Sequence, residues 1–458
     1  MKKTLVSLAA VAALTTGAMA ADKGIDIVTT GQAVVYYNTA AKSGGSGANK
    51  SQDLFGTSTT AGEMDNTRGN IGIQLNLDAD LKNGFTFGST INYLGTLGLE
   101  KNLVNSTMQN TNLATGAVHT NNNVGSTNVA DDIYLAQLFV AKKMGNTTLK
   151  LGRQELPKSL SPFAFSEGWN VFKNTFDAAL VVNTDIPDTT VVGAYVAGGN
   201  KNGFGANMSN FNNLAVNQHP VLGTGGLTVS GTAYMLTAQN KSIPMTTITA
   251  TYYDMAKVVG LTRGKDGANV IWGDVLVAGK DMPLGLKVGV QGGQTSAEDS
   301  TVADTAAYGV KIGLAPIKAL SLCLAYTSVD GDKNKANIAI QNIGGVKTPL
   351  YTQMVANQGF IRQDSDTYMI KAAYNTGDYG KIIAQYAGSD IGDGAQAAQM
   401  YLKNGKNEGK DFAEFDLVYK VKAANINWLA AYINQTWDDA SGAYDTQDIV
   451  RFVARYNF

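Results

Sequence analysis

The charged side chains with the greatest potential for chemistry lie in one stretch, from Leu151 to Val182, which reads LGRQELPKSLSPFAFSEGWNVFKNTFDAALVV. Acids and bases alternate along it between prolines, phenylalanines and a tryptophan; they are Glu155, Lys158, Glu167, Lys173 and Asp177. Carboxylates and cations held across a narrow gap create a transverse field, which orients dipolar solutes and sets an ion preference. The alternative is an ordinary solvated loop. The aromatic residues favour a segment that packs against another part of the protein.

Catalysis has little support elsewhere in the chain. His119 and His219 lie in polar stretches without a nucleophile motif, so we expect neither an enzyme nor a cofactor. Cys323 is the single cysteine, which excludes an internal disulfide and a cysteine-based metal cluster. The carboxylates of 298–304 and 364–366 could hold Ca²⁺, but neither stretch has EF-hand spacing, so a plain acidic loop is the simpler interpretation.

The elements that must position the charges are short alternating strands. The stretch NIGIQLNLDADL, 70–81, places an apolar residue at every second position, and the following Asn83-Gly84 is a strong hairpin signal. Mid-strand charges elsewhere fall mostly on the parity opposite to the apolar residues, so Asp274 is expected to face inward. A soluble sandwich also alternates, so a single hairpin does not decide the fold.

The number and spacing of the strands are more informative. The pattern predicts about 18 strands, the typical number for a large membrane barrel. They lie near 25–37, 68–81, 85–95, 132–143, 147–153, 174–184, 189–197, 228–239, 245–255, 268–279, 284–293, 305–314, 319–328, 366–375, 380–388, 411–421, 425–435 and 447–458. Short and long connections alternate, which is typical of a transmembrane antiparallel β-barrel with short periplasmic turns and long outer loops.

The two ends of the chain agree with this fold class. Residues 1–20 contain two lysines, an apolar run and Ala18-Met19-Ala20, which predicts a signal peptide and export through the periplasm. The rest, 21–458, is expected to form one barrel domain. The last strand alternates apolar and polar residues, with Phe452, Tyr456 and Phe458 on the expected lipid side. We interpret these three aromatics as the signal for outer-membrane assembly.

A barrel of this size leaves an aqueous lumen. Side chains alone can fill the interior only in much narrower barrels, of about 8 strands. The Leu151–Val182 stretch falls at the third long connection, so we expect an inward-folded third loop near 154–174. Its charges would face bases of the wall; the expected wall residues are Arg68, Lys150, Arg153, Arg451 and Arg455. In this hypothesis Glu155, Glu167 and Asp177 form a waist that favours cations weakly to moderately.

The exported barrel, the run Leu151–Gln154 (LGRQ) before the third loop and the final FVARYNF together resemble the OprD-like porins, and within them the major outer membrane porins of epsilonproteobacteria. The resemblance implies an 18-stranded pore narrowed by its third loop, a trimer, and passage of ions and small nutrients. The wider family includes amino-acid and carboxylate channels with a ladder of wall arginines. This chain has few arginines at inward mid-strand positions, which argues against a dedicated carboxylate pathway.

The sequence therefore predicts a porin for passive diffusion of ions and small hydrophilic solutes across the bacterial outer membrane. The alternatives are a substrate-specific channel for small nutrients and a surface-interaction or adhesin barrel. The expected partners are outer-membrane lipid and lipopolysaccharide, the barrel assembly machinery, the permeating solutes and two further copies in a homotrimer. A formal net charge of −1 gives no reason to expect a nucleic-acid partner.

Overall fold

The computed structural model describes residues 25–43, 53–55, 67–97, 103–104, 107–111, 132–214, 218–219, 231–259, 266–298, 300, 302–332, 336–392, 410–437 and 446–458. The expected signal peptide, 1–20, and His119 lie outside these residues. No helix within the described ranges is both long enough and apolar enough to cross a membrane.

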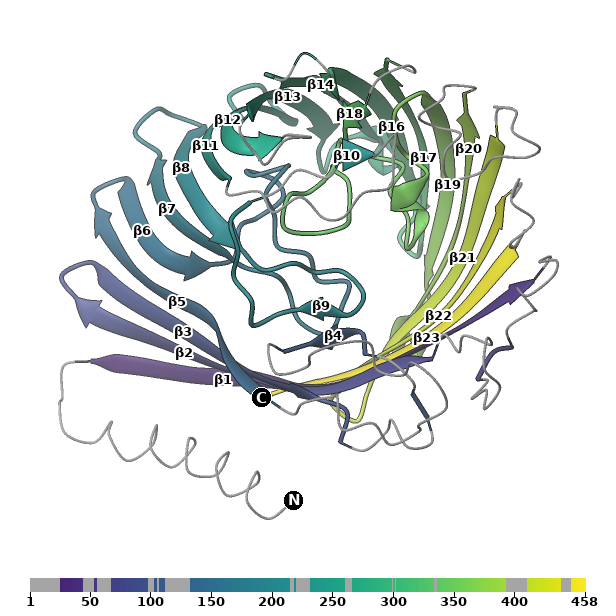
Figure 1. Cartoon of the computed structure of the whole chain (residues 1–458), viewed down its shortest axis with the longest axis horizontal. Helices are drawn as coiled ribbons and strands as arrows, with labels where there is room; N and C mark the ends of the chain where they lie inside the picture. Colours follow the sequence, from purple (N-terminus) through teal and green to yellow (C-terminus); the bar gives the residue numbers. More distant parts are fainter. Residues whose placement is uncertain are drawn as a thin grey trace.

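Eighteen antiparallel strands form one closed sheet (Figure 1). They are β1 (Asp26–Ser43), β2 (Arg68–Lys82), β3 (Phe85–Gly95), β5 (Asp132–Met144), β6 (Thr147–Gln154), β7 (Phe176–Asn183), β8 (Thr189–Gly199), β11 (Thr232–Asn240), β12 (Thr246–Val259), β13 (Asp266–Ala278), β14 (Lys287–Ala297), β16 (Thr305–Ile317), β17 (Leu320–Gly331), β19 (Ser365–Asn375), β20 (Lys381–Ile391), β21 (Lys410–Ala423), β22 (Ile426–Trp437) and β23 (Thr446–Asn457). The ring closes because β1 pairs with β23 as well as with β2, so no edge strand is left.

Most connections at one rim of the barrel are short turns, and the long connections lie at the other rim. Several turns contain non-glycine residues with positive φ, among them Asn83 at 51° and the pair Ala424 and Asn425 at 52° and 61°. Such left-handed pairs match the twist of tight hairpins. The sequence therefore predicted the barrel, the strand number and the alternation of connections correctly.

Most strand boundaries differ from the prediction by one to four residues, and two differences have a clear structural cause. β1 continues to Ser43, six residues beyond the expected end at 37, because residues 38–43 keep pairing with β23. β14 begins at Lys287, because Pro283–Gly285 forms a 3₁₀ turn, η3, which the alternation pattern could not reveal. Two further 3₁₀ turns are η4 (Asn357–Gly359) and η5 (Gly377–Tyr379).

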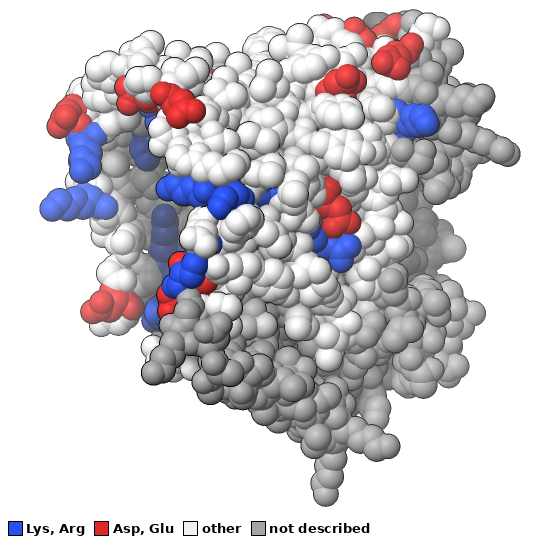
Figure 2. Space-filling view, turned by 90° about the vertical axis from the view of Figure 1, so that its left-hand side faces the viewer, with Lys and Arg blue, Asp and Glu red and all other residues white. Residues whose placement is uncertain are grey.

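The outer surface of the barrel is apolar. In β16, Tyr308, Val310 and Ile312 are exposed on the outside, while Ala307 and Gly309, which have the opposite parity, are buried. Figure 2, which views the side at the left of Figure 1, shows a mostly uncharged surface, with charged residues most numerous toward the left of the view. Phe452, Tyr456 and Phe458 also lie on the outer face and are about half exposed, at 47%, 44% and 54%. This is the arrangement that a hydrocarbon solvent requires.

Part of the lumen is filled by protein. Five short strands belong to the long connections; they are β4 (Gln109–Asn110), β9 (Ala206–Asn207), β10 (Gln218–His219), β15 (Val302–Ala303) and β18 (Ala336–Ile338). β9 and the coil around it lie within the ring in Figure 1. The third connection, 155–175, is called L3 below, and the connection 332–364 between β17 and β19 is called L7.

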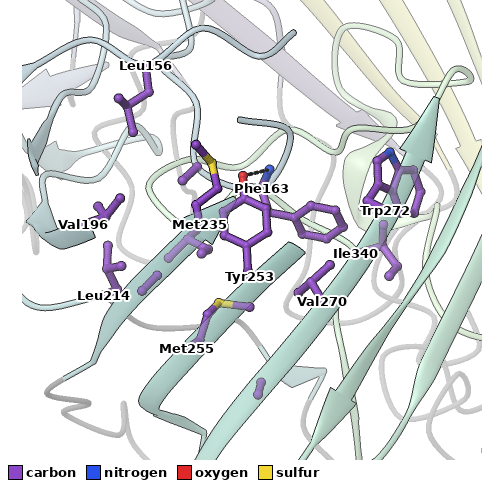
Figure 3. Close-up of a cluster of buried hydrophobic side chains, with 14 of the residues drawn as sticks. Leu156, Phe163, Val196, Leu214, Met235, Tyr253, Met255, Val270, Trp272 and Ile340 are labelled. Carbon is purple, nitrogen blue, oxygen red and sulfur yellow. Dashed lines mark hydrogen bonds between the residues drawn. The ribbon is translucent and has the colours of Figure 1, made fainter. Parts of the chain in front are cut away.

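A hydrophobic core packs L3 and L7 against the inner wall. It joins Leu156 and Phe163 of L3 and Ile340 of L7 to inward residues of β8, β11, β12 and β13 (Figure 3). Phe163 lies in edge-to-face contact with Tyr253 and Trp272, with ring centroids 5.9 and 5.4 Å away. The arc of wall from β7 to β13 is therefore apolar on both faces, and the open part of the lumen lies elsewhere.

Candidate pore constriction

L3 is fixed to two different parts of the wall. Three consecutive carbonyls of the loop accept hydrogen bonds from β1 and β23: Trp169 from the Tyr36 hydroxyl at 3.0 Å, and Asn170 and Val171 from the Arg455 guanidinium at 2.6 and 2.9 Å. On the far side, the Phe163 N–H donates to the hydroxyl of Tyr253 in β12 at 3.2 Å, the bond drawn in Figure 3. L3 therefore spans the lumen between these strands.

Arg455 was expected to face the open lumen, and it does point inward. Its guanidinium, however, is used by the two L3 carbonyls and by the side chain of Gln32 at 3.0 Å. Arg451 of β23 is also inward, buried, and donates to the side chain of Asn38 at 3.2 Å. Both arginines therefore support the constriction as well as charging it.

Glu167 lies between L3 and L7 instead of at an open edge of L3. It is 3% exposed, and its carboxylate accepts hydrogen bonds from the Trp169 indole N–H at 2.6 Å, the Asn342 amide at 2.8 Å and the backbone N–H of Lys347 at 2.8 Å. A Cβ on Gly345 would lie 1.9 Å from Glu167 Oε1, so only glycine fits there. Glu167 is a cross-link between the two loops.

L7 makes further contacts on each side. Its Ile343 N–H donates to the Phe163 carbonyl of L3 at 2.8 Å, and Lys158 Nζ of L3 donates to the Thr348 carbonyl at 3.0 Å. The Tyr351 hydroxyl donates to Asp274 of β13, which faces inward as expected. L3 and L7 therefore form one constriction.

A cavity of about 360 Å³ lies beside this constriction, along the wall formed by β19 to β23, and is called the passage below. It is lined by Tyr36, Gly168, Trp169, Lys347, Gln353, Met354, Val355, Lys371, Ile383, Gln385, Val418, Lys420, Leu429, Ala431, Arg451, Val453 and Arg455. Five of these side chains are bases, and none is a carboxylate. The passage is thus displaced to one side of the barrel and is lined by positive charge.

Three of the five bases were not among the expected site residues. Lys371 and Lys420 have inward parity in their strands, which the sequence reveals, but alternation cannot tell which inward positions border an open passage. Lys347 is in the polar connection 332–364, where no sequence signal indicates a return into the barrel. Enclosure within the constriction lowers the pKa of Lys347 to about 8, since burial penalises the charged ammonium.

Two expected waist residues are on the wrong side of the wall. Arg153 lies opposite the outward, exposed Leu138, and its guanidinium pairs with Asp177 of β7 at 2.9 Å. Gly152, at φ 118°, and the bulge between Asp177 and Ala178 mark irregular backbone at this point. The predicted placement of both charges in the pore is therefore wrong: they form an ion pair on the outer face, where Arg153 also stacks on Phe211 at 3.2 Å.

The remaining expected residues are inward or in L3, and most have partners. Glu155 pairs with Lys173 at 2.6 Å. Lys150 lies over the Phe139 ring at 3.6 Å, and Arg68 lies over the Phe204 ring at 4.6 Å. None of these residues borders the passage beside β19 to β23.

Metal binding gains no support from the described geometry. Within the described ranges, no group of three or more histidine, cysteine, aspartate or glutamate side chains is arranged to hold a metal ion. Residues 299 and 301 of the suggested calcium stretch 298–304 lie outside those ranges.

A closed barrel of 18 strands with an apolar outside, inward-folded loops and a polar passage defines the class of large transmembrane β-barrels. Solved structures share this fold over nearly the whole chain. Acinetobacter baumannii OccAB3 is 14% identical, with a TM-score of 0.68 over 94% of this chain and 99% of the other. Pseudomonas aeruginosa OccK8 (OprE) is 13% identical, with a TM-score of 0.67 over 94% and 98%.

A third structure of the same kind, Pseudomonas aeruginosa OccD3 (OpdP), is 12% identical, with a TM-score of 0.66 over 95% of this chain and 91% of the other. No family model and no curated protein matches the sequence. The barrel is thus of the architecture seen in these OprD- and Occ-type structures.

Proposed function

We propose that this protein is an outer-membrane diffusion channel for small hydrophilic solutes that favours anions, including carboxylate-bearing nutrients. One observation carries the proposal: five bases and no carboxylate line the passage beside L3 and L7. Positive charge in a narrow, weakly screened lumen raises the local concentration of anions and excludes cations. The similarity to OprD- and Occ-type structures supports a channel of this kind.

The cation preference suggested by the sequence rested on carboxylates with other roles in the structure. Glu155 and Asp177 each have a cationic partner, and Glu167 is buried in bonds between the loops. The ion pairs reduce the fields of Glu155 and Asp177. Glu167, whose hydrogen bonds come from neutral donors, is a single negative charge beside the five bases that line the passage. This geometry favours the substrate-selective alternative over a cation-preferring general porin.

Reversal potentials in planar bilayers test the proposal. Purified protein in a salt gradient should show stable ohmic steps and a reversal potential that favours the anion. Lys371→Gln with Lys420→Gln should shift that potential toward cations, whereas Lys280→Gln, on the exposed turn between β13 and β14, should leave it unchanged. A cation-favouring potential, insensitive to the double substitution, would refute the anionic pathway; no conductance at all would refute the channel.

We also propose that the protein forms a homotrimer, contacts lipid and lipopolysaccharide, and is recognised by the barrel assembly machinery. The narrower resemblance to epsilonproteobacterial porins belongs to the same proposal. Export and outer-membrane location also belong to it. The structures quoted above come from Pseudomonas and Acinetobacter.

A further inference from the structure

The tip of L7 closes one side of the passage. Gln353, Met354 and Val355 line it directly, opposite inward residues of β20 to β23. Lys347 Nζ folds back and donates to the carbonyls of Met354, at 3.1 Å, and Val355, so the tip is a compact unit. Movement of this unit away from the wall would widen the passage.

Two buried carboxylates of β21 hold the tip against the wall. Asp416 Oδ2 accepts a hydrogen bond from the Val355 N–H at 3.2 Å, and Glu414 Oε1 accepts one from the Ala356 N–H at 2.9 Å. The side-chain amides of Gln385 and Gln435 donate to the same two carboxylates at 2.6 Å each. Glu414 and Asp416 are 0% exposed, although like charges two residues apart share one strand face.

Several charged groups act on this pair. Burial disfavours the ionised form of both carboxylates, and Lys347 of L7 and Arg451 of β23 are cations that oppose this effect; Lys371 of β19 also interacts with Asp416. Glu167 of L3 acts on Lys347 from the other side. If both carboxylates were neutral, the bonds to Val355 and Ala356 would lose their charge assistance, which makes such bonds roughly twice as strong as neutral ones. Lys347 and Arg451 would then repel each other with less compensation.

We propose that the tip of L7 is an acid-released gate, held over the passage while Glu414 and Asp416 are ionised and released when they are protonated. Glu167 keeps the base of L7 on L3 through the Lys347 N–H and the Asn342 amide, so the tip moves while its root stays in place. The proposal rests on the channel function and assigns it a control by pH.

Single-channel recordings of the full-length protein at pH 7.5 and pH 4.5 test the gate, together with exclusion of polyethylene glycols of graded size. We expect the conductance to rise at pH 4.5 on the order of twofold, because conductance follows the open cross-section. Larger polyethylene glycols should then enter. Glu414→Gln with Asp416→Asn should show the wide state already at pH 7.5 and no further pH response.

The matched control is Asp78→Asn, a carboxylate of β2 that lies opposite Val28 of β1 and Gly88 of β3, which should keep the wild-type pH step. A conductance change without a change in the polyethylene glycol cut-off would overturn the gate, because altered pore charge alone would explain it. Ohmic steps that are the same at both pH values would also overturn it, while leaving the channel function intact. Absence of steps at either pH would instead refute the channel itself.

Discussion

Gly31 is expected to be essential for closing the barrel, because the terminal aromatic residue occupies the space beside it. The backbone N–H of Gly31 donates to the Phe458 carbonyl at 2.8 Å, and the Phe458 N–H donates back at 3.0 Å. A Cβ on Gly31 would lie 2.5 Å from the Phe458 ring and 2.6 Å from the Gln74 carbonyl oxygen. Neither distance is tolerable, so the ring and the β1–β2 backbone would both have to shift.

Overpacking of this kind costs about 1–3 kcal/mol. We therefore expect Gly31→Ala to lower the free energy of unfolding of the refolded barrel by that amount, measured by urea titration in lipid vesicles. Gly193→Ala is the matched control: it is also in a strand, a Cβ there meets nothing within 4 Å, and the change should be neutral or slightly stabilising.

A double-mutant cycle separates the ring from the backbone. If the Phe458 ring causes most of the cost, Gly31→Ala combined with Phe458→Ala should be less destabilising than the two single effects added together. Equal losses for Gly31→Ala and Gly193→Ala, or strict additivity in the cycle, would refute the reasoning that the terminal ring needs a glycine opposite it.

Three further predictions follow from other contacts. Replacing Tyr456 and Phe458 with Asp should block outer-membrane insertion, since both aromatics face the lipid; normal surface levels in whole-cell labelling would contradict this. Phe163→Ala should lower the free energy of unfolding by about 3–5 kcal/mol, because it empties the contact with Tyr253 and Trp272, whereas exposed Phe55→Ala should change it little in the same urea assay. The pKa of Lys347 is lowered to about 8, so its charge is largely present at pH 7 and largely lost at pH 9. The anion preference in salt-gradient recordings should therefore fall between pH 7 and pH 9, and Lys347→Met should abolish this pH dependence.

The sequence specified the wall far better than the contents of the barrel. Alternation has a period of two, and the hydrocarbon around a barrel enforces it, so Tyr308, Val310 and Ile312 identify their strand and its outer face without further information. Arg153 and Asp177 were assigned to the pore because of the charge content of their stretch. Parity alone would have placed them outside, since Arg153 alternates in step with the outward Leu151 and Asp177 with the outward Val181.

The constriction depends on contacts between residues far apart in the chain, and no local pattern encodes them. Glu167 reaches Lys347, and Val355 reaches Asp416, across separations that periodicity cannot bridge. The charge composition of L3 correctly drew attention to the loop. It could not show that the Glu167 carboxylate would be buried in hydrogen bonds to L7, or that the bases of β19 to β23 would border the passage.

L3, L7 and the β7–β13 arc share a hydrophobic core inside the barrel, much as a water-soluble domain has a core of its own. Shortening L3 is a natural engineering step to widen the pore. It would expose Met235, Tyr253 and Trp272 and so create an apolar surface in contact with water inside the channel. Such a surface would invite dewetting or capture of apolar molecules. The L7 tip is no simpler place to cut, because Val355 and Ala356 there also cover apolar wall residues, among them Val418, Ala431 and Ile433.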